Sequence, residues 1–519
     1  MTKKILFILF LIIFVDCNNQ KKLYINTIKS DSYKDYNFFL EKYPSGKYSD
    51  EIKQKRLEKD SIEILIGTFL GNESRNYYGD SLPDRLDTIW SFYLGEGLSS
   101  AYGYNKIWKG AGWTGQPILV NEKGRLFVVQ PAFDYGLHKI DAQTGKEVWC
   151  YKFDDILKAS PTIYVNRHSN NIENRYIIMQ GSRKGWDKDK DSRYCWSFRA
   201  ISYISGKELW RMNSLPTACY SRDVDGSAIV IDDSAYLALE NGIFNVFSPD
   251  FSLGSKVDSF TVPKIFKQIQ YFTYEDIKAH GDDLVAEASP TYFNNRVYTP
   301  SGTGWIYGYN IFKGSTDWQF YIGADLNGTM PLTNDNCLLV PIEKQYIKGN
   351  GGVMKIDPSK DPKDAVVWFL PTDTVNWSHW EGGVIGSITV NDKTKASSDP
   401  YIAVFVDCKG FLYVVDYMNL QDDTVVLGPD GATMFKTPVV LAKIKLISTI
   451  ATPIIVKNRI LVPCDGALYL YEFSYTNNQF SIQLLDMIDK MSIDATPICW
   501  NGRIYLADFN GYLWCLGKQ

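Results

Sequence analysis

The chain has 519 residues and a formal net charge of −4, and 14% of its residues are aromatic. It lacks the basic excess that marks proteins binding nucleic acid by electrostatic attraction, so we exclude nucleic acid as a partner. Nine cysteines occur without any C-x-x-C motif, so the common signatures of structural zinc and c-type haem are missing.

The first residues have the pattern of an export signal. Lys3 and Lys4 precede an apolar run from Ile5 to Val15, which is shorter than the roughly 20 residues that span a bilayer. Because Cys17 follows this run, the segment resembles a bacterial lipoprotein signal, which implies cleavage after residue 16 and a lipid on Cys17. Asp16 departs from that pattern, where a small residue is usual. A plain export signal and an uncleaved anchor are the alternatives.

Residues 32–69 show helical spacing, with inward positions at Phe39, Tyr43, Ile52 and Leu57. Pro44–Gly46 divides this stretch into two short helices. The phrase FLEKYPSGKY at 39–48 is similar to part of a tetratricopeptide hairpin, but one copy cannot form a solenoid. We therefore expect an anchor, a linker and a short helical segment at residues 17–86, which act as a spacer or a docking arm.

A short phrase that ends in tryptophan recurs through the rest of the chain. Residues 137–149 read LHKIDAQTGKEVW and residues 199–210 read RAISYISGKELW, with looser copies at 307–318 and 353–368. Self-similarity over tens of residues is typical of repeat architectures, in which each unit buries its apolar face against the next.

Short apolar strands and glycine turns surround each copy. A unit begins with a strand such as KASPTIYV at 158–165 and later enters another through a glycine turn, as in NGIFNVF at 241–247. Such turns favour tight hairpins because glycine adopts a positive φ at little cost. Four antiparallel strands per unit, here termed A to D, predict an all-β fold. We expect an eight-bladed β-propeller of four-stranded antiparallel blades at residues 87–519.

The motif Asp-x-x-Thr-Gly-Lys-x-x-Trp at Asp141–Trp149, repeated in part at Ser205–Trp210, resembles the repeat of PQQ-like β-propellers. Outer-membrane assembly lipoproteins of that family are similar to this chain in size, blade number and anchor. The resemblance implies a non-catalytic scaffold in the cell envelope, lipid-anchored to the bacterial outer membrane on its periplasmic or cell-surface side. It would bind a protein partner or another ligand.

Tryptophans are predicted to pack between neighbouring blades, and one of them closes the ring. The packing residues are Trp149, Trp210, Trp318 and Trp368. The last unit, at 491–518, contains only three strands. Either the strand at 87–94 with Trp90 or the strand at 104–110 with Trp108 must supply the fourth, and the sequence leaves this choice open.

The loops before the A strands share one mouth of the central channel, so their large polar and aromatic residues form the predicted binding site. These residues are Trp113, Gln116, Lys158, Arg222, Asp223, Asp225, Glu287, Asn327, Glu381 and Asp494. A solvated channel that binds nothing is the alternative.

Two of these loops carry further signals. The loop 376–383 contains Trp377, His379, Trp380 and Glu381, which suit a sugar, a peptide or a partner's loop but could also cap a blade. The stretch 221–227 contains Asp-x-Asp-Gly, a fragment of a calcium loop without the distal Glu. An internal Arg–Asp salt bridge explains this stretch better, and we predict no metal.

Two functions other than a scaffold are considered. An extracellular module that binds glycans or peptides would use the loop 376–383. A PQQ-dependent dehydrogenase would share the eight-bladed ring, but the vicinal cysteine pair of such enzymes is absent. We therefore predict no cofactor and no catalytic residue. The eight cysteines after Cys17 either pack as apolar thiols or form disulfides that the sequence does not assign.

Overall fold

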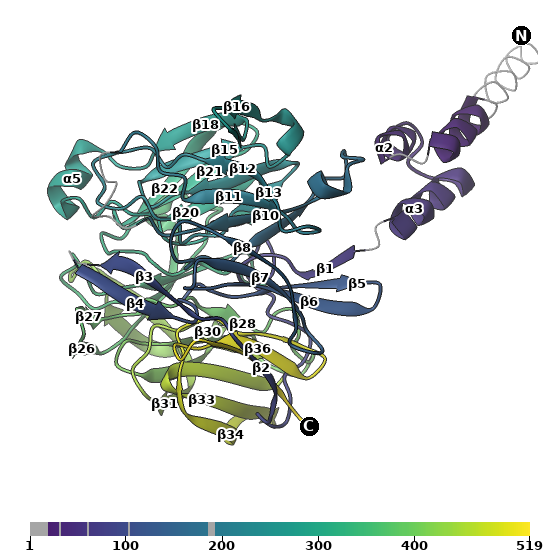
Figure 1. Cartoon of the computed structure of the whole chain (residues 1–519). Coiled ribbons are helices and arrows are strands. Elements are labelled where there is room, and N and C mark those ends of the chain that lie inside the picture. The colour runs from purple at the N-terminus through teal and green to yellow at the C-terminus, as the bar shows by residue number, and fades with distance from the viewer. Residues whose placement is uncertain (1–18, 31–32, 60–61, 102–103, 185–191) are drawn as a thin grey trace, which may run out of the picture.

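The computed structural model describes residues 19–30, 33–59, 62–101, 104–184 and 192–519. The predicted signal at 1–16 and the predicted lipidation site Cys17 lie outside these residues. Figure 1 shows a ring of sheets and, next to it, the helices of the N-terminal part. None of the helices in the described part has the length and apolar character that crossing a membrane requires.

The N-terminal helices follow the predicted pattern up to residue 59. Residues 19–30 are helical, followed by α2 (Tyr33–Lys42) and α3 (Lys47–Lys59). Phe39 and Ile52 are fully buried between them, as their spacing predicts. The prediction of helix as far as residue 69 is wrong, because Ile62–Ile66 forms strand β1. This segment, IEILI, is rich in β-branched residues, which favour a strand.

Eight antiparallel sheets form the ring, which confirms the predicted eight-bladed β-propeller. The first four blades are β5 (Ile118–Glu122), β6 (Arg125–Pro131), β7 (Gly136–Asp141) and β8 (Glu147–Lys152); β9 (Thr162–Val165), β10 (Tyr176–Gly181), β11 (Phe198–Ser202) and β12 (Glu208–Met212); β13 (Ile229–Ile231), β14 (Ser234–Ala238), β15 (Ile243–Phe247) and β18 (Ile265–Gln270); and β19 (Thr291–Phe293), β20 (Arg296–Pro300), β21 (Trp305–Asn310) and β22 (Ser315–Tyr321).

The other four blades contain two irregular ones. They are β23 (Leu338–Ile342), β24 (Gly352–Ile356) and β25 (Val366–Pro371); β28 (Thr389–Val390), β29 (Ile402–Val406), β30 (Phe411–Leu427) and β31 (Met434–Lys445); β32 (Ile454–Val456), β33 (Arg459–Thr476) and β34 (Gln479–Ser492); and β35 (Ile498–Trp500), β36 (Arg503–Ala507), β37 (Tyr512–Gly517) and β2 (Thr88–Tyr93). In the fifth blade the A strand is reduced to a bridge between Leu332 and Leu338. In the seventh blade β33 supplies both the B and the C arm, one on each side of Gly466.

The ring is closed by the strand that carries Trp90. β2 pairs antiparallel with β37, and Trp90 lies opposite Cys515. Trp108 belongs instead to a separate hairpin of β3 (Glu96–Ala101) and β4 (Tyr104–Lys109). The first and last parts of the propeller therefore share one sheet, which removes two exposed strand edges.

The recurrent tryptophans pack between blades as predicted. The indole Nε1 of Trp149 donates to the backbone oxygen of Tyr203 in the next blade at 3.1 Å, and Trp90 donates to Ala142 at the same distance. The same contact occurs at Trp210, Trp318 and Trp368. The motif requires glycine at position 145 for a physical reason. Gly145 has φ +70°, and a Cβ there would lie 2.9 Å from the Trp90 indole.

Residues 67–80, here called the central segment, lie in the middle of the ring. β1 leads into it by pairing with β5, the A strand of the first blade. Backbone hydrogen bonds then join the segment to A-strand residues of other blades, including Ile163, Tyr292, Leu332 and Cys499. Residues before the predicted boundary at 87 thus take part in the ring: β1 pairs with the first blade from its inner edge, and the Leu86 N–H donates to Asp486 Oδ2 on the outer strand β34 at 2.8 Å. The boundary itself stays a prediction.

The central segment enters and leaves on the same side of the ring. Ile62 pairs with Glu122 next to the A–B turn of the first blade, and Asp80 accepts a hydrogen bond from the backbone of Asn501 in the A–B turn of the last. We call this side the A–B face. The opposite side, where D strands connect to the next A strands, is the D–A face.

Three insertions extend from D–A connections. They are the β3–β4 hairpin, helix α5 (Tyr274–His280) and the hairpin of β26 (Thr374–Trp377) and β27 (Trp380–Gly382). In Figure 1 they lie together on the left of the ring, away from β1 and the N-terminal helices on the right. The smaller elements β16 (Ser255–Val257), β17 (Phe260–Val262), η1 (Ile172–Asn174), η2 (Phe251–Leu253) and η3 (Pro362–Asp364) complete the chain.

Candidate binding site on the D–A face

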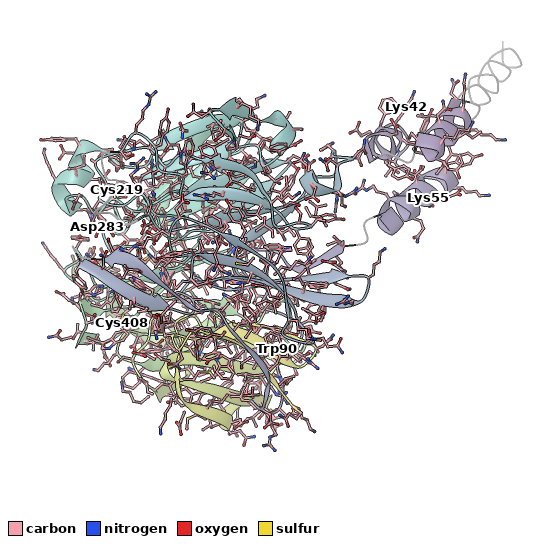
Figure 2. The ribbon with its side chains drawn as sticks, viewed as in Figure 1. Lys42, Lys55, Trp90, Cys219, Asp283 and Cys408 are labelled. Carbon is pink, nitrogen blue, oxygen red and sulfur yellow. The ribbon has the colours of Figure 1, made fainter. Side chains whose placement is uncertain are left out.

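Seven carboxylates gather where A strands begin and B strands end on the D–A face. We call them the acidic cluster: Asp223, Asp225, Glu240, Asp283, Glu287, Asp325 and Glu343. Three of them were predicted, as were Lys158 and Asn327, which contact them. In Figure 2, Asp283 lies on the same side of the ring as Cys219 and Cys408, opposite the helices that carry Lys42 and Lys55.

One half of the cluster surrounds a lysine of the chain itself. The Lys158 ammonium forms an ion pair with the fully buried carboxylate of Asp225. Oxygens of Asp225, Glu240 and Glu287 lie within 4.8 Å of one another. Burial opposes the charge on Lys158, but the surrounding carboxylates outweigh it and raise its pKa. Burial raises the pKa of Glu287 to about 8 and that of Glu240 well above its usual range.

The stretch at 221–227 contains ion pairs, but not the predicted one. Asp223 accepts a hydrogen bond from Nε of Arg183 at 3.0 Å, and Asp225 pairs with Lys158. Arg222 instead donates to the backbone oxygen of Ser214 at 2.8 Å. The predicted Arg–Asp salt bridge therefore exists with Arg183 in the place of Arg222, because Arg222 is used to fix its own D–A connection.

The other half of the cluster is held by amide and hydroxyl donors. The Asn327 amide donates to Asp325 Oδ2 at 2.9 Å and to Glu343 Oε2 at 3.0 Å, and Tyr346 donates to Asp283 Oδ2 at 2.8 Å. Within the described residues, none of these three carboxylates pairs with a lysine or arginine. Burial raises the pKa of Asp325 well above its usual range and that of Glu343 to about 8.

Aromatic side chains lie beside the acidic cluster. Trp113 packs with Ile385, Cys408 and Ile450 from the opposite part of the ring, and Trp377 and Trp380 pack against the same group. The rings of Trp377 and Trp380 lie 5.2 Å apart, opposite each other in the β26–β27 hairpin. Cys408 joins the two regions, because it contacts these aromatics and the Glu343 charge helps to raise the pKa of its thiol.

Four predicted site residues lie outside the cluster. His379 and Glu381 are exposed on the β26–β27 hairpin, and burial lowers the pKa of His379. The Gln116 amide holds the central segment, since it donates to Thr68 O at 3.1 Å. Asp494 lies at the start of the last blade, where burial raises its pKa to about 7.

Sequence reasoning missed Arg183, Glu240, Asp283, Asp325 and Glu343. Three of these, Arg183, Glu240 and Glu343, directly follow a B strand or come two residues after it. B strands end on the same face as A strands begin, so the B–C turns open toward the same mouth. Charged residues in those turns were the signal that could have completed the set.

A second group of possible metal ligands, His138, Glu147 and Cys150, lies in the first blade. His138 uses both ring nitrogens, with Nδ1 2.6 Å from Glu147 Oε1 and Nε2 3.0 Å from Asp134 Oδ1. Burial opposes its charge, but these carboxylates raise its pKa well above the usual value. These contacts hold His138 as a buried imidazolium and indicate a structural role in strand β7.

No protein-family model matches this chain, and no curated protein matches it. Solved structures do match. BamB from Moraxella catarrhalis has a TM-score of 0.47 at 12% identity, over 84% of this chain and 98% of that one. The computationally designed Ika8 protein has a TM-score of 0.45 at 10% identity, over 84% and 100%.

A europium-containing methanol dehydrogenase has a TM-score of 0.51 at 13% identity, over 89% of this chain and 92% of that one. At this identity the likeness supports the fold alone, a β-propeller. Function has to be argued from the side chains, because one fold supports many activities.

Proposed function

We propose that this chain is a non-catalytic, envelope-anchored β-propeller that holds a protein partner against its D–A face. One observation carries the proposal: the two faces of the ring differ. The central segment enters and leaves the ring on the A–B side, whereas all three insertions and the acidic cluster lie on the D–A side.

Exposed apolar side chains on the insertions support a partner of macromolecular size. Leu98, Tyr104 and Ile107 of the β3–β4 hairpin are 51%, 61% and 56% exposed, and Tyr274 of α5 is 70% exposed. Apolar patches with neighbouring polar groups mark interaction surfaces on soluble domains. Two of the three insertions, the β3–β4 hairpin and helix α5, present such residues on the D–A face.

The side chains argue against catalysis. The eight described cysteines are unpaired. Burial raises the pKa of the Cys219 thiol to about 12 and also raises that of Cys408, whereas a nucleophilic thiol needs a lowered pKa. The two histidines nearest this face, His280 and His379, have lowered pKa values through burial.

A quinone cofactor of the PQQ type does not fit the acidic cluster. Such a cofactor carries carboxylates of its own, and a buried anion needs basic partners. Among the described residues, the cations that form ion pairs with the cluster are Lys158 and Arg183, which are bonded to Asp225 and Asp223. An anionic cofactor would therefore face a surplus of negative charge.

Purification of the full-length protein from its own membranes in a mild detergent tests the proposal, with the Cys17→Ala variant as the comparison. We expect the wild type in the membrane fraction with a stoichiometric partner, and the variant in the soluble fraction with little partner. The reason is that acyl chains supply the membrane affinity while the ring stays in water.

The two parts of the proposal fail separately. A variant that remains in the membrane fraction would contradict the anchor but not the partner. A wild-type protein recovered as a monomer would contradict the scaffold function and favour a small ligand at the mouth.

A further inference from the structure

The acidic cluster contains two halves with similar side chains, and among the described residues only one half forms ion pairs with cations of the chain, Lys158 and Arg183. In the first half, the Lys158 ammonium lies against Asp225, with Glu240 and Glu287 close by. In the second half, the Asn327 amide bridges Asp325 and Glu343, and Tyr346 donates to Asp283, but no lysine or arginine among the described residues pairs with these carboxylates.

Unsatisfied oxygens distinguish the second half from a cluster that is merely acidic. Asp325 is 5% exposed, and its Oδ1 has no hydrogen-bond partner among the described residues, while its Oδ2 is held by Asn327. A buried carboxylate oxygen without a partner costs free energy, so it is kept in native proteins where a ligand or ion satisfies it.

The neighbouring aromatics indicate which kind of cation fits. Glu343 bridges to Gly383 at the end of the β26–β27 hairpin, and the backbone N–H of Cys408 donates to Gly383 O at 3.0 Å. Cys408 packs in one apolar cluster with Trp113, against which Trp377 and Trp380 also pack. Aromatic faces attract organic cations, and carboxylates form their strongest hydrogen bonds with ammonium and guanidinium donors. A bare metal ion would make no use of the tryptophans. The Asn327 side chain would also be a poor metal ligand here, because it turns its NH₂ group toward the two carboxylates.

We propose that Asp283, Asp325 and Glu343, next to the tryptophans of the β26–β27 hairpin, form a binding site for an organic ammonium or guanidinium group. This inference rests on the proposed function in one respect, because it places the site on the same D–A face. It names the chemistry that a partner would insert there: the end of a lysine or arginine side chain, or a free amine.

We expect the site to release protons when it binds a cation. Glu343 holds its proton near neutral pH in the free protein, because burial and neighbouring carboxylates raise its pKa to about 8, and burial also raises the pKa of Asp325. Asp283 adds negative charge around both groups, and Lys158 acts on the neighbouring Glu287. Since a bound cation stabilises the ionised carboxylates, we expect its affinity to rise between pH 6 and pH 8.5.

Isothermal titration of the purified full chain at low salt tests the site. The probes are putrescine, a tripeptide with a central arginine and calcium chloride. We expect saturable binding of an organic probe, weakened about tenfold or more when Asp325→Asn and Glu343→Gln are combined, because charge-assisted hydrogen bonds are lost. Glu275→Gln is the matched control, because it removes an exposed carboxylate of helix α5 on the same face and should leave the affinity within about twofold.

Comparing the probes shows whether the bound cation comes from a protein side chain or from a free amine. Tighter binding of the tripeptide identifies a protein side chain, and tighter binding of putrescine identifies a free amine. Equal binding by the wild type and the double variant would overturn the inference, as would calcium binding that no organic probe displaces. A partner recovered equally with the wild type and the double variant would refute this site while leaving the scaffold function intact.

Discussion

Replacing Arg75 by Met is expected to lower the free energy of unfolding by about 3–5 kcal/mol, the range for breaking a buried polar network. Arg75 is fully buried in the central segment. Its guanidinium donates to Phe69 O at 2.7 Å within the segment, and to Pro290 O at 2.8 Å and Ser227 O at 3.0 Å in two different blades. Methionine fills a similar volume but leaves these buried oxygens without donors.

The loss should be visible as a lower midpoint of thermal unfolding and as faster proteolysis within residues 62–86. Arg85→Met is the matched control, because Arg85 is exposed and bonds only to Asp87 at 3.3 Å. It should change the free energy by less than about 0.5 kcal/mol. If both variants unfolded at the same temperature as the wild type, the central segment would not be a structural part of the ring.

Combining Glu287→Gln and Glu343→Gln is expected to stabilise the free protein at alkaline pH, by about 2–4 kcal/mol at pH 9. In the folded chain the pKa of each carboxyl is about 8, above its ordinary value of 4.5. The folded chain therefore retains protons that the unfolded chain has released. Stability from these groups is complete below about pH 4.5 and is lost as the pH rises through about 8.

Thermal unfolding of wild type and double variant at pH 4, 7 and 9 measures this effect. At pH 4 the two should agree closely, because both glutamates are protonated in the folded chain and largely protonated in the unfolded chain. At pH 9 the variant should be more stable. Parallel curves across this range would mean that water or a counter-ion already neutralises the two carboxylates. A higher stability of the variant at pH 9 would fit a binding site, because functional sites keep groups that weaken the free fold.

The architecture could be predicted because each blade repeats local signals. Alternating apolar strands, glycine turns and the motif ending in Trp149 specify one blade at a time. The motif keeps glycine at position 145 because the indole of Trp90, from another blade, packs directly against it. Ring closure was narrowed to two strands but not resolved, because Trp90 and Trp108 lie in segments with similar composition.

The central segment could not be foreseen from the sequence. Residues 67–80 match no repeat, and their stability comes from contacts with residues far along the chain, such as Leu332 and Cys499. The helical prediction extended through Ile62–Ile66 for the same reason: pairing with β5 in the ring decides that these residues form a strand.

The binding site was predicted in part. Asp225, Glu287 and Asn327 were found because each precedes an A strand. Their partners Glu240 and Glu343 follow B strands, which reach the same face from other positions in the blade. Gln116 was placed at the mouth by its position alone, whereas its amide is used to hold the central segment.

Site-specific photo-crosslinking in native membranes tests most directly whether the D–A face is the partner-binding face. Photoreactive residues at Ile107 and Tyr346 lie on this face, and residues at Lys123 and Asn458 lie in exposed A–B turns. We predict that the two D–A positions crosslink to the same partner and that the two A–B positions do not. Crosslinks from the A–B turns alone, or from none of the four positions, would contradict the account.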